Sequence, residues 1–218
     1  MTLDKGARAA GDAAGDAAGD AGAKRGPRQL ADPLTIRAIA HPTRLALLEA
    51  LTLHQPLTAT EAAEAIGETP TNCSFHLRML AKYGFVEEAG EAPGRRRPWR
   101  LTRIGFTHGD TADDAETSHA SEALAGLLWD RWLDRIEAVK ARRSRFEGAW
   151  AKVTSGTENL AFVTPEEAEQ LIADVRAVLD RYRDRLEDAT RRPEGSLPVE
   201  AVLFTYPVGA AKSEDEPA

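Results

Sequence analysis

The feature that most constrains the fold is a pair of short helical segments separated by a glycine. Thr58 and Glu61 have the spacing of a capping box, in which the hydroxyl and the carboxylate each accept a hydrogen bond from a backbone amide. Gly67 predicts the end of that helix, and Thr69, followed by proline at the first helical position, predicts the start of the next. Gly84 predicts its end. Two short helices joined by a tight turn have the layout of a helix-turn-helix.

Apolar residues on these helices, and upstream of them, supply a core. We expect Ala62, Ala65 and Ile66 to face inward from the first helix, and Phe75, Leu77, Leu80 and Ala81 from the second. Asp32 followed by Pro33 predicts an earlier helix, and Pro42 starts another, with His41 as a structural or capping residue at the joint. The inward residues of the earlier helices are Leu34, Ile36, Ile39, Leu45, Leu47, Leu48 and Leu51.

A basic hairpin is predicted to follow the second helix. Residues 85–89 and 98–102 are short, partly alternating segments, and the loop between them carries glycines and three consecutive arginines. A polar-fronted helix followed by such a hairpin is the arrangement expected for one helix in a major groove and a wing on the backbone or minor groove. The candidate DNA-contacting residues are Thr69, Thr71, Asn72, Ser74, Phe75, His76 and Arg78 on the helix and Arg95, Arg96 and Arg97 in the hairpin.

These candidates have different expected roles. Thr71, Asn72 and Ser74 lie in the first turns of the helix, where they can reach base edges, whereas Arg78 is better placed for the DNA backbone. The ring of Phe75 either turns into the core or meets a thymine methyl group. Arginines in a loop are often only solvated, but the hairpin context favours phosphate or minor-groove contact.

Two short sequence motifs within residues 32–105 resemble those of the ArsR-like winged helix-turn-helix regulators. Residues 41–48 read HPTRLALL, which is similar to the family's opening helix, and residues 74–80 read SFHLRML, which is similar to its recognition-helix signature. The resemblance implies a transcriptional regulator, acting as a repressor, that binds double-stranded DNA as a homodimer. Phe75 departs from the family pattern, which often has a polar residue there. The closely spaced cysteines of the family's metal sensors are absent, so we expect no metal or other cofactor.

The distribution of charge agrees with this interpretation although the whole chain carries a net charge of −7. Residues 1–34 have no net charge, residues 35–105 carry +2 and residues 110–218 carry −9. The basic surplus therefore lies in the segment predicted to bind DNA, where arginines cluster at the hairpin.

The C-terminal half is predicted to be helical. After a polar linker at residues 106–120, residues 122–155 show an apolar stripe typical of one long amphipathic helix, which would pack against a second subunit or another helix. Thr164 and Glu167 form a second capping box and start another helix, which ends near Arg191. Residues 159–163 and 199–206 are strand-like and could pair in a small sheet.

The predicted fold is therefore mainly α (α+β). A winged helix-turn-helix domain at residues 30–105 precedes a helical dimerisation and possible sensor region at residues 121–208. Low-complexity residues 1–29 and polar residues 209–218 are expected to be disordered tails. Lys24, Arg25 and Arg28 could touch DNA phosphates as a flexible arm or form a solvated linker.

Enzymatic and membrane functions find little support in the sequence. Cys73 and His76 could share a helix face, but a nucleophile also needs a pocket and an oriented base. Apolar runs are too short for a membrane span and no secretion signal is recognised, so we expect a cytoplasmic protein.

The alternative function is a winged-helix protein whose C-terminal half binds a small-molecule effector or protein. Its aromatic residues could line a cavity there: Trp129, Trp132, Phe146, Trp150, Phe162 and Tyr182.

Overall fold

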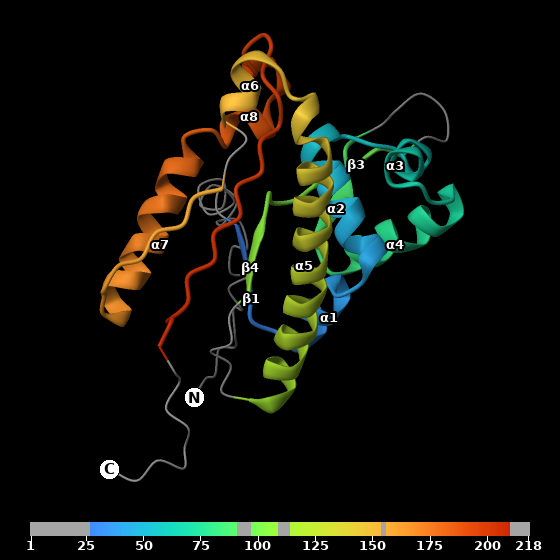
Figure 1. The fold of residues 1–218 in the computed structure, drawn as a ribbon. Coiled ribbons are helices and arrows are strands. Elements are labelled where there is room, and N and C mark those ends of the chain that lie inside the picture. Colours follow the sequence, from blue (N-terminus) through green and yellow to red (C-terminus); the bar gives the residue numbers. More distant parts are fainter. Residues whose placement is uncertain (1–26, 91–96, 109–113, 154–155, 210–218) are drawn as a thin grey trace, which may run out of the picture.

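The computed structural model describes residues 27–90, 97–108, 114–153 and 156–209. The chain is mostly helical, with two small two-stranded sheets, and a long helix follows the N-terminal domain (Figure 1). Most of both predicted disordered tails, and Arg95 and Arg96, lie outside the described residues.

Four helices with side-chain caps form the N-terminal domain. They are α1 (Pro33–Ile39), α2 (Pro42–His54), α3 (Ala59–Ile66) and α4 (Pro70–Lys82). The predicted caps are confirmed: Asp32, His41, Thr58 and Thr69 each accept a hydrogen bond from a backbone N–H in the first turn. Gly67 has a φ of 72° at the end of α3, in the left-handed region that glycine enters without strain, and so turns the chain sharply into α4.

The predicted hairpin is also confirmed. Strands β2 (Val86–Glu88) and β3 (Trp99–Leu101) are antiparallel, with Glu87 opposite Arg100. Leu57, between α2 and α3, extends this sheet, because its N–H and C=O exchange hydrogen bonds of 3.0 and 2.7 Å with Trp99. The hairpin is thus fixed to the helical domain at the loop end of β3.

A second sheet closes the domain where the sequence predicted a tail and a linker. Strand β1 (Arg28–Leu30) pairs in parallel with β4 (Phe106–His108). The disordered-tail prediction for Arg28 is therefore wrong. Its guanidinium donates a 2.7 Å hydrogen bond to the Tyr83 carbonyl and lies 4.3 Å from the centre of the Phe85 ring. This residue supports the end of α4 rather than acting as a free arm.

Three residues that were predicted to belong to the core lie at the surface instead. The fully buried members of the core include Ile36, Ile39, Leu47, Leu51, Leu77, Leu80 and Leu124. Leu34, Ala65 and Phe75, which were expected to face inward, are exposed, and Ala63 is buried instead of Ala65. The burial of Cys73 and His76 rotates the inner face of α4 away from Phe75, because positions 73, 76, 77 and 80 recur every three to four residues.

The long helix begins earlier and ends earlier than expected. Helix α5 (Ala115–Arg142) starts within the predicted linker, at the Asp114 cap, and packs against α1. It is followed by a 3-10 turn at Arg143–Arg145 and by α6 (Gly148–Val153), so residues 122–155 do not form one helix. Its buried residues, Thr117, Ala120, Ser121, Leu124 and Leu128, all lie in its first half.

The remaining C-terminal elements are helices without a buried face. They are α7 (Pro165–Asp180), with the predicted Thr164–Glu167 capping box, α8 (Asp184–Glu187) and a 3-10 turn at Ala189–Arg191. Residues 159–163 and 199–206 form no strand, so the predicted pairing is wrong for the single chain. No described residue after Leu128 is buried.

Candidate nucleic-acid interface

Helix α4 presents one exposed stripe along its length. Thr71, Phe75, Arg78 and Lys82 are exposed and lie four, three and four residues apart, the spacing of one helical face. The opposite face, with Cys73, Leu77 and Leu80, is buried where α4 packs against α2 and α3. The fold thus holds the stripe outward on a rigid support. Sequence reasoning missed Lys82, which the same periodicity could have identified.

Phe75 lies on this stripe with its side chain half exposed. The residue retains 53 % of its accessible surface, so of the two predicted placements the ring adopts the outward one. Its only ring contact within the described residues is an edge-on one to His76, at 5.2 Å between centroids. An exposed aromatic ring between a threonine and an arginine supplies an apolar contact of the kind a thymine methyl group accepts.

The start of α4 is held by local hydrogen bonds. The Thr69 hydroxyl accepts from the Asn72 backbone N–H at 3.2 Å, so this candidate acts as a helix cap. The Asn72 side chain donates to the Glu68 carboxylate at 3.0 Å, whereas Thr71 beside it is exposed. Thr69 and Asn72 therefore order the turn, and Thr71 presents its hydroxyl at the surface.

An open hollow joins α4 to the hairpin. Ser74 and Arg78 from α4 line it together with Arg97 and Trp99 from the hairpin. The first turn of α3 closes the third side, with residues 58–61. The structure therefore brings together Ser74, Arg78 and Arg97, which the sequence assigned to one function from separate segments.

The basic side chains of the hairpin are paired with carboxylates on its surface. Arg97 lies 2.9 Å from Glu88, and Arg100 lies 2.8 Å from Glu87. All four side chains remain about half exposed or more, and exposed ion pairs typically contribute less than about 1 kcal/mol. These arginines can therefore exchange a carboxylate for a phosphate at little cost.

Among the residues of α4 that were predicted to contact DNA, only His76 is buried. It is only 6 % exposed, and its ring lies 4.6 Å from that of His41, between centroids. Burial, followed by the neighbouring His41 and Arg44, lowers the pKa of His76. The structure thus places the His76 side chain inside the domain, against His41 at the start of α2, and not on the exposed stripe of α4.

The chemistry of Cys73 is that of a core residue. Its side chain is fully buried, and burial raises the pKa of its thiol, which disfavours the reactive thiolate. Among the described residues, no cluster of three histidine, cysteine or acidic side chains could hold a metal ion.

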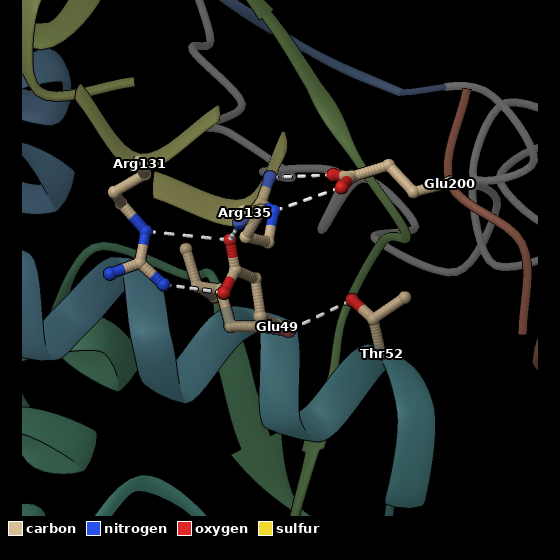
Figure 2. A network of polar contacts seen from close by, with 6 residues as sticks. Glu49, Thr52, Arg131, Arg135 and Glu200 are labelled. Carbon is tan, nitrogen blue, oxygen red and sulfur yellow. Dashed lines mark hydrogen bonds and ion pairs between the residues drawn. The ribbon is translucent and has the colours of Figure 1, made fainter. Parts of the chain in front are cut away.

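A polar network connects the helix-turn-helix core to the C-terminal half (Figure 2). Glu49 on α2 accepts from both Arg131 and Arg135 on α5, and Arg135 also binds Glu200 with 2.9 and 2.5 Å contacts. Three segments far apart in sequence therefore meet at one guanidinium. No local sequence pattern signals this network, because its hydrogen-bonded partners are separated by 65 to 86 residues.

The aromatic residues predicted to line a cavity in the C-terminal half are only partly brought together among the described residues. Trp129 and Trp132 contact each other, but Phe162 is fully exposed and Tyr182 is half exposed. A small hollow lies instead between α2, the parallel sheet and α5, with Arg28, Glu49 and Leu128 among its lining residues.

Comparison with known proteins identifies the N-terminal domain. A family model described as a helix-turn-helix domain matches residues 39–89, which run from the end of α1 through β2. No curated protein shows significant similarity to the chain. The domain supports a DNA-binding regulator of the helix-turn-helix class and points away from an enzyme. None of the described helices is long and apolar enough to cross a membrane.

Proposed function

We propose that this chain is an ArsR-like transcriptional repressor that binds double-stranded DNA as a homodimer. The observation that carries the proposal is the exposed stripe of α4, formed by Thr71, Phe75, Arg78 and Lys82, beside a basic hairpin. An α-helix with its side chains is about 10–12 Å across, and the major groove is about 12 Å wide. The stripe therefore enters the groove, with Thr71 and Phe75 toward base edges and Arg78 toward the backbone.

The hairpin serves as the wing in this proposal. Arg97 shares a hollow with Ser74 and Arg78, so a DNA strand that meets α4 also passes the loop end of the hairpin. Arg95, Arg96 and Arg97 then neutralise phosphates beside or within the minor groove. Each phosphate contact releases a condensed counterion, which makes binding weaker as salt increases.

The dimer is proposed to form through α5. Beyond its buried first half, this helix exposes Leu133, Ile136 and Val139, spaced three residues apart along one side. Exposed apolar side chains in such a row are typical of a protein–protein interface. A two-fold axis beside α5 places the two copies of α4 in successive major grooves, with half-sites about 34–36 Å apart.

Gel shift on the protein's own promoter, repeated at several salt concentrations, tests the wing. Changing Arg95, Arg96 and Arg97 together to alanine should weaken binding and reduce the salt slope by roughly 0.9 for each phosphate that is no longer neutralised. The reduced slope separates the removal of phosphate binding from a general decrease in folded protein.

A matched control is available on the same chain. Arg142, Arg143 and Arg145 are also three exposed arginines close together, at the far end of α5. Changing these three to alanine removes the same charge and should leave the salt slope unchanged. An unaltered affinity and slope in the hairpin variant would remove the wing from the proposal.

A further inference from the structure

The segment at residues 197–208 lies against α5 on one side only. Phe204 stacks on Trp129, with the ring centres 4.0 Å apart and the planes 10° from parallel, and contacts Trp132 edge-on at 5.3 Å. Glu200, four residues earlier, binds Arg135 on the same helix. These contacts fix which side of the segment faces α5, namely the side that carries the even-numbered residues 200 to 204.

The other side of this segment carries exposed side chains, and its backbone is unpaired within the described residues. Leu203 and Leu197 each retain 53 % of their surface, and Val199 is more exposed still. Within the described part of the chain, the backbone of residues 199–206 makes no backbone hydrogen bond. The sequence VEAVLFTY is nevertheless rich in the β-branched and aromatic residues favoured in strands. An extended, apolar segment with unpaired edges is a template for pairing with another strand.

We propose that residues 199–206 pair with the same residues of a second copy, forming an antiparallel two-stranded sheet across the dimer. This inference rests on the proposed homodimer and locates a further part of its interface. The segment is held on α5 by the Arg135–Glu200 ion pair, and Arg135 is the neighbour in sequence of the exposed Ile136, which belongs to the apolar row proposed for the dimer. Residues 110–218 carry a net charge of −9, yet Glu200 is the only charged residue of this segment and already has a partner in Arg135. The C-terminal halves of two copies, although acidic overall, can therefore approach each other at this segment.

A register with the two-fold axis at Leu203 satisfies both symmetry and side-chain chemistry. A two-fold axis perpendicular to the sheet keeps the α5-facing residues of both copies on one face, so a residue must pair with one of the same parity. Centring the axis at Leu203 places this residue opposite its own copy, Val202 opposite Phe204, and Glu200 opposite Tyr206. Like charges then do not face each other, and apolar residues pair on both faces.

Disulfide cross-linking tests this register. In the full-length protein, Leu203→Cys should form a covalent dimer under mild oxidation, because directly opposite Cβ atoms lie about 4.5–5.5 Å apart. Leu197→Cys is the matched control, with the same residue type and the same 53 % exposure. In the proposed register the two copies of residue 197 lie about 40 Å apart, so this variant should not cross-link. Wild-type protein, whose single cysteine is buried, should not cross-link either.

Sedimentation of the same proteins separates this inference from the proposed function. A non-covalent dimer in which Leu203→Cys cross-links no faster than Leu197→Cys would overturn the intersubunit sheet and leave the α5 dimer standing. A monomer at all concentrations would overturn both. As an independent measurement, Leu203→Lys should raise the dimer dissociation constant at least tenfold, because two lysines would face each other, whereas Leu197→Lys should have little effect. Equal effects of both lysines would also contradict the register.

Discussion

Two histidines, the partly buried His41 at the start of α2 and the buried His76 on α4, lie in contact beneath the proposed DNA-binding surface. His41 caps α2 by accepting a 3.2 Å hydrogen bond from the Thr43 backbone N–H at its Nδ1, which requires that nitrogen to be unprotonated. The Nδ1 of His76 is buried and has no hydrogen-bond partner within the described residues. Burial is the main cause that lowers the pKa of each imidazole, and Arg44 lowers both further. Glu68 raises both pKa values, but by less than Arg44 lowers them.

The stability of the N-terminal domain should therefore fall on mild acidification. Because both pKa values lie below the ordinary value of about 6.5, the unfolded chain binds more protons than the folded chain once the pH drops through that value. The urea midpoint should decrease between about pH 7.5 and pH 5.5, since burial disfavours the protonated form of both imidazoles in the folded state. His76→Leu should make this decrease smaller, whereas the same change at exposed His119 is the control. An equal decrease in wild type and His76→Leu would contradict the explanation.

The individual site residues could be predicted in part from the sequence. The three-residue spacing of caps and the exposed first turn of α4 follow from local rules, and Thr71, Ser74 and Arg78 lie where those rules place them. Hydrophobicity alone would place Phe75 in the core and His76 at the surface, whereas the structure buries His76 and exposes Phe75. The neighbouring His41 ring provides a site for an imidazole, and this contact joins residues 35 positions apart, which the sequence does not reveal.

At the scale of elements, α5 is the connection between the two halves of the molecule. Its first half packs on α1, and its Arg131 and Arg135 hold Glu49 on α2 (Figure 2). Since α2 in turn packs against α4, a change in the position of α5 has a direct path to the proposed DNA-binding helix. The orientation of α4 therefore depends on contacts outside the helix-turn-helix.

Glu49→Gln tests this connection. The change removes the charge that two arginines share, and we expect a decrease of about 1 kcal/mol in unfolding free energy, since the carboxylate is partly exposed. Hydrogen exchange should become faster in α5 around Arg131. The control is Glu116→Gln, which breaks the exposed pair with Arg37 between α5 and α1 and should change stability little. Equal effects of the two variants would show that the Glu49 network has no special role.

Helix starts were easier to predict than strands, for a physical reason. A cap such as Thr58 or Thr164 satisfies amides within three residues, so the signal is local. A strand needs a partner, and residues 199–206 have no strand partner within the described chain even though their sequence favours a strand. Strand β1 pairs with a segment 78 residues away, so no local signal marks it as a strand. The low complexity of the preceding tail also obscured where β1 starts.

For the whole molecule, burial is divided unevenly between the two halves. Every buried described residue lies between Leu30 and Leu128, while α7 and the extended segments expose large apolar side chains such as Leu171 and Phe162. Ordering a chain costs about 1–2 kcal/mol of backbone entropy per residue, which apolar burial must offset. The proposed dimer would cover apolar side chains of the C-terminal half, where no described residue after Leu128 is buried in the single chain.

The most direct test of DNA reading by α4 is equilibrium binding to duplex DNA enriched by the protein from a random pool. Wild-type protein should bind an enriched duplex at least about a thousandfold more tightly than a scrambled duplex at the same salt concentration. The double variant Thr71→Ala, Phe75→Ala should retain its helical content and lose at least roughly tenfold of that preference, since both side chains lie on the exposed stripe of α4. Failure to enrich any duplex, or an undiminished preference in the folded double variant, would contradict the claim that α4 reads DNA.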